Sequence, residues 1–261
     1  LSYFTLAYSW RAASVVSGCI ILALCLPLAG LMHRSPEERG LEPDGGPGKV
    51  ENAEQDGPRE ATVDEVDFTI KQALKTFTFW LLTLCISLRI LVTVAISAHM
   101  IPILVWKGMD EAAAAYMVSL YAFLTIIGML VVGWIGDRFK KSMLCCVCLL
   151  ITAVCLMWQT VSSTGTTLYL LPVGMAIAMG SVPLNWSLIG DFFGRRSYAR
   201  LRGIMLISVG ITTFISPVYA GWIFDRTESY TVVLISFSGM LLIPAVLFAI
   251  LRPPAPAKLE K

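Results

Sequence analysis

Six uncharged stretches long enough to cross a lipid bilayer constrain this chain more than any other feature of its sequence. They run over Ala12–Met32, Ala112–Ile135, Ser142–Ser163, Thr166–Gly190, Ile204–Phe224 and Tyr230–Leu251, and each is 21 to 25 residues long. A helix needs about 20 residues to cross the hydrocarbon core. A seventh stretch, Phe77–Trp106, is 30 residues long and is interrupted only by Arg89 and His99.

We therefore expect an all-α membrane bundle with seven spans. Lipid leaves no partner for bare backbone polar groups, so spanning segments are helical unless they form a closed barrel, whose short alternating segments are absent here. Composition agrees, because 15% of the residues are charged, against about a quarter in soluble domains. All seven cysteines fall inside expected spans without metal-ligand spacing, so we expect packing residues and neither disulfides nor a metal or cofactor site.

The lysine and arginine residues predict the orientation in the membrane. Taking alternate loops, sixteen fall on one side and three on the other, namely Arg11, Lys107 and Arg226. Basic residues concentrate in cytoplasmic loops, so the richer side is expected to face the cytoplasm of a cell membrane, together with the C-terminus. Because these residues are spread over short loops, the lipid bilayer is an expected partner and nucleic acid is not.

The chain divides unequally around a polar segment. We expect the end of a first half at 1–32, a cytoplasmic linker rich in Glu, Asp, Pro and Gly at 33–76, six spans at 77–252 and a tail at 253–261. Thr69 and Gln72 fit a capping box that opens a short interfacial helix. Many carriers join two six-helix halves through a long cytoplasmic loop, so we expect five further helices upstream of Leu1, which complete the partner half.

A short motif between the third and fourth spans carries a family resemblance. It comprises Gly133, Gly136, Asp137, Arg138, Phe139, Lys140 and Lys141. The motif resembles the cytoplasmic signature G-x-x-x-D-R-x-G-R-R/K of the major facilitator superfamily, with Lys140 in place of the second glycine and Ser142 in place of the last basic residue. The resemblance implies a conformational latch made by Gly133, Asp137, Arg138 and Lys141. An ordinary basic loop is the alternative.

Other segments are similar to the bacterial monocarboxylate and oxalate/formate-type branch of that superfamily. They are Tyr8 to Arg11, Pro36 to Gly45, Asp191 to Arg196, and Ala220 to Asp225. The resemblance covers nearly the whole chain and implies family helices six to twelve. Two departures weigh against transferring a substrate directly. Ile204–Phe224 lacks the lysine of the oxalate/formate type, and Ala112–Ile135 lacks the acid–arginine pair of animal monocarboxylate carriers.

Arg89 is the most informative candidate for a substrate-binding residue. It lies about 12 positions into its span, roughly 18 Å at 1.5 Å per residue, and therefore near the bilayer centre. An arginine at this depth is costly and usually faces a cavity or a partner. Cys85, Arg89, Thr93 and Ser97 share one face of the helix, so a pore-facing cation that binds a carboxylate is expected. The alternative is a structural arginine paired with the upstream half or with backbone carbonyls.

Further candidates are weaker. His99 precedes Pro102, which is expected to break the helix. The histidine is expected to act in gating, to bind substrate or to titrate during transport, or else to be a hydrated residue at a helix end. Asn185 and Trp186 follow Pro183, where they contact substrate or belong to a bent packing helix. Tyr121 is a pore-lining candidate, as are Ser119, Thr212 and Thr213.

Together these features predict a secondary transporter that moves a small organic anion by alternating access. The uncharged stretches contain no carboxylate, so a proton-coupling acid is expected in the upstream half, unless His99 serves instead. Three alternatives stay open: an efflux carrier for neutral or cationic drug-like solutes, a non-transporting sensor on a carrier scaffold, and a membrane enzyme. The enzyme is disfavoured, because no span has a nucleophile triad or a metal motif.

Overall fold

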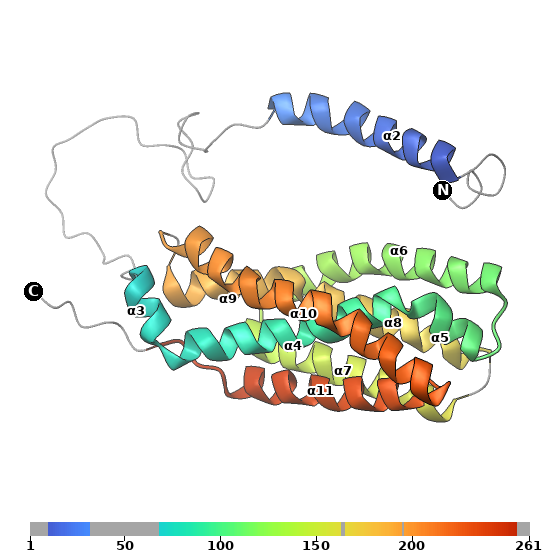
Figure 1. The fold of residues 1–261 in the computed structure, drawn as a ribbon. Helices are drawn as coiled ribbons and strands as arrows, with labels where there is room; N and C mark the ends of the chain where they lie inside the picture. Colours follow the sequence, from blue (N-terminus) through green and yellow to red (C-terminus); the bar gives the residue numbers. More distant parts are fainter. Residues whose placement is uncertain (1–9, 32–67, 163–164, 195, 255–261) are drawn as a thin grey trace, which may run out of the picture. The chain divides into compact units, whose positions relative to one another are not determined.

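The computed structural model describes residues 10–31, 68–162, 165–194 and 196–254, and their regular structure is entirely helical (Figure 1). Two compact units divide the chain, residues 1–60 and residues 61–261. The expected linker lies mostly outside the described residues, as do most of the tail, Tyr8 and the Pro36–Gly45 motif. The all-α prediction is confirmed.

The first unit holds one described helix, α2 (Trp10–Leu31), which has 22 residues and contains Pro27. A helix is confirmed where the first span was expected. Its apolar part is the shorter stretch Ser14–Gly30, whereas six spans of the second unit are long and apolar enough to cross a membrane. Arg11 lies in the first turn of α2.

The six spans of the second unit are built from eight helices and one 3₁₀ turn. They are α4 (Phe77–Ala98) with α5 (Met100–Trp106), α6 (Glu111–Gly136), α7 (Lys141–Val161), η2 (Thr167–Tyr169) with α8 (Leu170–Gly180) and α9 (Val182–Phe193), α10 (Tyr198–Thr227), and α11 (Thr231–Ile250). Several helices extend beyond their uncharged stretches, so Glu111, Asp191 and Asp225 lie at helix ends.

Two of the six spans are interrupted, both beside the prolines that the sequence identifies. α4 stops at Ala98 and α5 begins at Met100, with His99 as the cap between them and Pro102 in the first turn of α5. α8 ends at Gly180 and α9 starts at Val182, with Pro183 in its first turn. Proline has no N–H to donate and is tolerated in a first turn, which is consistent with each second segment beginning within two residues of its proline.

A short helix leads into the first of the six spans. In α3 (Ile70–Lys75) the expected capping box is present, because the Thr69 hydroxyl accepts from the Gln72 backbone N–H and the Gln72 side chain accepts from the Thr69 N–H. The Ser197 hydroxyl donates to the Phe68 carbonyl at 2.7 Å, which ties this lead-in to the start of α10.

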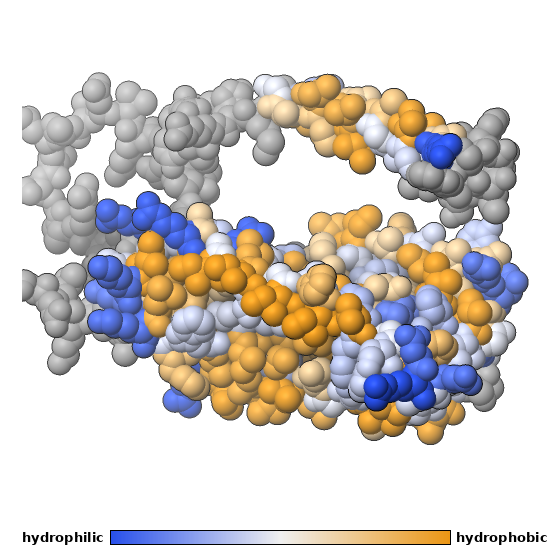
Figure 2. Space-filling model, in the orientation of Figure 1, coloured by the Kyte–Doolittle hydropathy of each residue, from blue (hydrophilic) through white to orange (hydrophobic). Residues whose placement is uncertain are grey.

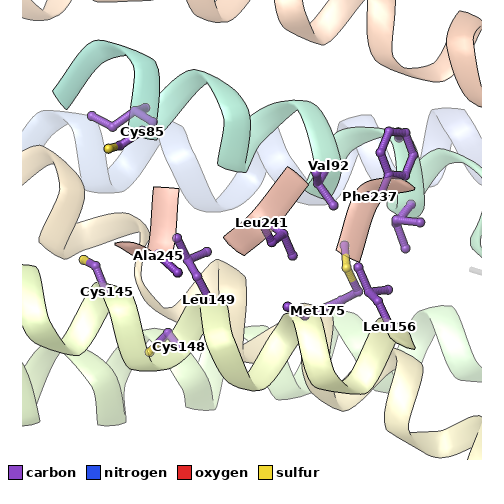
Figure 3. Close-up of a cluster of buried hydrophobic side chains, with 14 of the residues drawn as sticks. Cys85, Val92, Cys145, Cys148, Leu149, Leu156, Met175, Phe237, Leu241 and Ala245 are labelled. Carbon is purple, nitrogen blue, oxygen red and sulfur yellow. The ribbon is translucent and has the colours of Figure 1, made fainter. Parts of the chain in front are cut away.

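α4 is the central helix of the second unit. It packs against α10 and α11, while α7 packs against α11 and α8, and α6 packs against α8. Figure 3 shows the resulting apolar layer, in which Val92 of α4, Leu149 of α7 and Leu241 of α11 point toward one another. α6 and α10 leave most of their length uncovered within this unit. The face of the second unit that is visible in Figure 2 is largely hydrophobic, and hydrophilic residues gather toward its two ends.

Backbone-to-backbone contact joins α6 and α8. A Cβ atom placed on Gly180 would lie 2.9 Å from the Gly128 carbonyl oxygen, a distance that Cβ atoms do not adopt. Glycine at both positions is therefore what lets the two helices approach this closely. Gly136 makes a second tight contact, against Leu184, whereas Gly133 has open space beside it within the described unit.

Candidate functional site

Arg89 lies near the middle of α4, and its side chain is only 2% exposed. Among the described residues, its Nε and Nη1 atoms have no hydrogen-bond partner. A buried donor without a partner costs about 1–3 kcal/mol, and more when it is charged. A buried guanidinium that is incompletely bonded therefore lowers the stability of the fold, and its two N–H donors can bind a further acceptor.

Polar side chains of α6 and α7 lie near this guanidinium, and Asn185 of α9 is linked to them through Cys145. Arg89 interacts electrostatically with the Cys145 thiol of α7 and the Tyr121 hydroxyl of α6. The Cys145 thiol donates to the Oδ1 atom of Asn185 on α9 at 3.4 Å. Asn185 is fully buried, and its Nδ2 atom has no partner in the described part of the chain. We call Arg89, Tyr121, Cys145 and Asn185 the Arg89 cluster.

The Arg89 cluster offers mainly hydrogen-bond donors. The free groups are N–H groups of Arg89 and Asn185, while the amide oxygen of Asn185 is already occupied by the thiol. Oxygen atoms that only accept are the natural complement of such a set, and a carboxylate carries two of them. Within the described residues, no group of three or more His, Cys, Asp and Glu is placed to hold a metal ion.

The polar stripe of α4 turns toward the interior of the six-span unit. The Thr93 hydroxyl donates to the Arg89 carbonyl at 3.0 Å, and the Ser97 hydroxyl donates to the Thr93 carbonyl at 2.6 Å. Ser97 also lies 3.3 Å from the Tyr121 hydroxyl. Thr93 is thus bonded within its own helix, whereas Ser97 connects the stripe to Tyr121 and so to the Arg89 cluster.

His99 lies apart from the Arg89 cluster and uses both of its ring nitrogens. Nε2 is 3.1 Å from the Pro217 carbonyl oxygen, and Nδ1 is 3.1 Å from the Tyr230 hydroxyl. A carbonyl can only accept, so Nε2 carries the proton and Nδ1 of the neutral ring accepts from tyrosine. His99 therefore connects the break between α4 and α5 to α10 and to the start of α11.

Trp186 is next to Asn185 in sequence but has a different partner. The guanidinium carbon of Arg202, on α10, lies 4.4 Å from the centre of the Trp186 ring, which is a cation–π contact. The indole therefore faces the α9–α10 contact. Trp186 and Asn185 are separated because successive residues of a helix point about 100° apart.

The latch candidates lie where α6 ends and α7 begins. Asp137 caps the C-terminus of α6, is exposed, and forms no ion pair within the described ranges. Arg138 lies over the Trp134 ring at 4.1 Å. Lys141 is the motif residue that pairs across helices, since its Nζ atom lies 2.7 Å from Asp191 Oδ2 and 2.6 Å from the Ser187 hydroxyl of α9.

Two members of these arrangements were missed by sequence reasoning. Cys145 was expected only to pack, since nothing in its sequence neighbourhood marks it. Asp191 belongs to a segment that was quoted for its family resemblance but was given no role. The signal that could have indicated Asp191 is a carboxylate at the same predicted membrane side as Lys141, two turns beyond Asn185.

The sequence is similar to those of known membrane transporters. The sequence matches the Major Facilitator Superfamily over residues 100–261. It is similar to Monocarboxylate transporter 12 of Mus musculus, with 21% identity over 94% of this chain and 54% of that protein. Monocarboxylate transporter 12-B of Danio rerio is 23% identical over 92% of this chain and 54% of its own length. Monocarboxylate transporter 12 of Xenopus laevis is 25% identical over 51% of this chain and 30% of that protein. The chain therefore spans about half or less of the length of these relatives.

Proposed function

Because the chain belongs to the Major Facilitator Superfamily, we propose that it forms part of a secondary transporter that moves a small organic anion by alternating access. With six apolar spans it is a multi-pass membrane protein. The proposal includes a second, upstream half of the same chain, whose movement against this unit would expose a midplane site to each side in turn. The uneven distribution of basic residues supports a cytoplasmic linker and C-terminus in a cell membrane.

The observation that carries the proposed substrate class is the incompletely bonded guanidinium of Arg89. Its Nε and Nη1 atoms are buried, have no hydrogen-bond partner in the part of the chain that the structure describes, and belong to a residue expected near the bilayer centre. A carboxylate can bind a guanidinium through two parallel hydrogen bonds, and such charge-assisted bonds are stronger than neutral ones. Binding an anion would therefore give partners to two buried donors that have none among the described residues.

Tyr121 and Asn185 are the proposed partners of Arg89 in this site. Both belong to the Arg89 cluster, and Asn185 adds a further buried N–H donor. Thr93, His99 and Trp186 complete the proposed site less directly, because their polar atoms or rings are engaged with neighbouring helices. The similar proteins of Mus musculus and Danio rerio are named as monocarboxylate transporters, which supports a single carboxylate as the charged group of the proposed substrate.

The latch proposal concerns the cytoplasmic end of this unit. Gly133, Asp137, Arg138 and Lys141 are proposed to stabilise one gate conformation. The Lys141–Asp191 ion pair supports this, since it fixes the start of α7 against the end of α9. Asp137 is exposed and is available to an element of the upstream half.

Uptake by the full-length protein in proteoliposomes tests the substrate proposal. Arg89→Ala is expected to reduce uptake of a radiolabelled monocarboxylate at least about tenfold, since charge-assisted hydrogen bonds contribute about 1.5–3 kcal/mol. Arg89→Lys should restore little, because lysine lacks the planar fork. The control is Arg226→Ala, which removes an arginine lying over Trp222 at the far end of α10.

Two results would contradict the proposal. Normal anion uptake by Arg89→Ala would remove Arg89 from the site. Uptake of neutral or cationic solutes, with no anion uptake by the wild-type protein, would favour the drug-efflux alternative, in which Arg89 is structural.

A further inference from the structure

A lateral groove separates the ends of α6 and α7 that the basic residues predict to be cytoplasmic. Its volume is about 410 Å³, and it is lined by Ile135, Phe139, Lys140, Met143, Leu144 and Val147. Five of these six residues are apolar. The groove lies outside the Arg89 cluster and beside the residues of the proposed latch.

The groove crosses two levels of a membrane. α6 ends at Gly136 and α7 begins at Lys141, so the end near Lys140 lies at the edge of both spans. Val147 lies six residues into α7, about 9 Å deeper at 1.5 Å per residue. One end of the groove therefore lies at headgroup level, and the other lies among acyl chains.

The side chains of the groove are accessible from outside the six-span unit. Phe139, Met143 and Val147 are 67%, 50% and 47% exposed. A hydrophilic substrate would find a single polar group here, so the lining argues against a second transport site. An acyl chain is instead the occupant whose chemistry matches the five apolar residues.

The charges at the shallow end favour an anionic group. Lys140 is exposed and makes no ion pair in the described part of the chain, while Lys141 is already paired with Asp191. Arg138 is exposed on the adjoining turn, and Asp137 is the carboxylate of the same turn. Because Arg138 already lies over the Trp134 ring, Lys140 is the cation of this turn that is left to attract an anion. The cytoplasmic leaflet is rich in anionic lipids, which basic residues at this level attract.

We propose that this groove binds an anionic phospholipid, with an acyl chain along Phe139, Met143 and Val147 and the headgroup beside Lys140. The proposal does not depend on the identity of the transported solute. It does depend on the groove remaining open to lipid when the rest of the protein is present, which makes the full-length protein the required sample.

Native mass spectrometry of the full-length protein, with added phosphatidylglycerol or phosphatidylcholine, tests the site. Lys140→Gln should weaken phosphatidylglycerol binding about fivefold, as expected for one interfacial lysine. Lys71→Gln is the control, since Lys71 is an exposed lysine of α3 on the same predicted side. Val147→Trp should fill the groove and reduce bound lipid. Val154→Trp is its control, because Val154 is on the same face of α7 seven residues further on and outside the groove.

Three results would overturn the proposal. The first is equal phosphatidylglycerol binding by Lys140→Gln and Lys71→Gln. The second is binding of phosphatidylcholine as tight as that of phosphatidylglycerol, which would indicate general lipid contact. The third concerns access: a cysteine introduced as Met143→Cys that resists a membrane-soluble maleimide in the full-length protein, while Val154→Cys reacts, would mean that protein covers the groove.

Discussion

The thiol of Cys145 on α7 donates a hydrogen bond to the Oδ1 atom of Asn185 on α9, over a distance of 3.4 Å. This bond satisfies one end of a fully buried amide and leaves the Nδ2 end without a partner among the described residues. A thiol is a weak donor, so the contact orients the amide more than it stabilises it. The bond therefore connects Asn185 to the rest of the Arg89 cluster through Cys145.

Asn185→Leu is expected to stabilise the protein while impairing transport. Removing a buried donor that lacks a partner should raise the free energy of unfolding by about 1–2 kcal/mol, since its desolvation is no longer uncompensated. Uptake should fall, because the site loses one donor. Unfolding in detergent and uptake in proteoliposomes measure the two effects on the same preparation. A variant that transports normally but unfolds more easily would show that Asn185 is structural.

Gly180→Ala and Gly210→Ala should change stability in opposite directions. A Cβ atom at Gly180 would overlap the Gly128 carbonyl, so about 1–3 kcal/mol of stability should be lost through overpacking. Gly210 has open space and lies inside α10, where alanine should gain about 0.5–1 kcal/mol over glycine. Thermal unfolding of both variants provides the comparison. If Gly180→Ala proved as stable as Gly210→Ala, the tight contact between α6 and α8 would be excluded.

Lys141→Asp should weaken the cytoplasmic end, and combining it with Asp191→Lys should recover much of the loss. The wild-type pair is 2.7 Å apart, and its side chains are 25% and 45% exposed. A partly exposed pair contributes about 0.2–1 kcal/mol, so the expected coupling is small and should shrink at high salt. A double-mutant cycle of unfolding at two salt concentrations measures it. Additive effects of the two changes would indicate no interaction.

Tyr230→Phe should remove a source of alkaline sensitivity. Burial and then the nearby Asp225 raise the pKa of Tyr230 above its ordinary value of 10.0. Above pH 10 the unfolded chain therefore loses this proton while the folded protein retains it, so stability that is complete below pH 10 falls as the pH rises toward the folded-state pKa.

Comparing unfolding of wild type and Tyr230→Phe between pH 8 and pH 11 isolates this contribution, since all other titrating groups are shared. At pH 8 the variant should be less stable by about 0.5–1.5 kcal/mol, having lost the hydrogen bond to His99. The difference should shrink above pH 10. A difference that is constant across this range would contradict the assignment.

Sequence reasoning predicted most of the secondary structure because the controlling signals are local. Uncharged length identifies the six spans, and Pro102 and Pro183 locate the two breaks. The capping box at Thr69 likewise depends on residues three apart.

The site depends on pairs that are far apart in sequence and was predicted only in part. Cys145 meets Asn185 across 40 positions, and Lys141 meets Asp191 across 50. Which faces of α7 and α9 meet depends on helix packing, and hydrophobicity does not determine it in spans that are apolar all round. Arg89 could be selected because a charge in mid-span is costly wherever it points, but the direction in which it points could not.

The glycine contact between α6 and α8 limits how this half of the protein can move. Where two backbones touch at Gly128 and Gly180, no side chain is present whose rotamer change could absorb sliding or rotation. We therefore expect the parts of α6 and α8 around this contact to move together as one rigid body, and bending to occur elsewhere. Pro102 and Pro183, just beyond His99 and Ser181, each remove one backbone N–H donor, so these two helix breaks are the natural hinges for that bending.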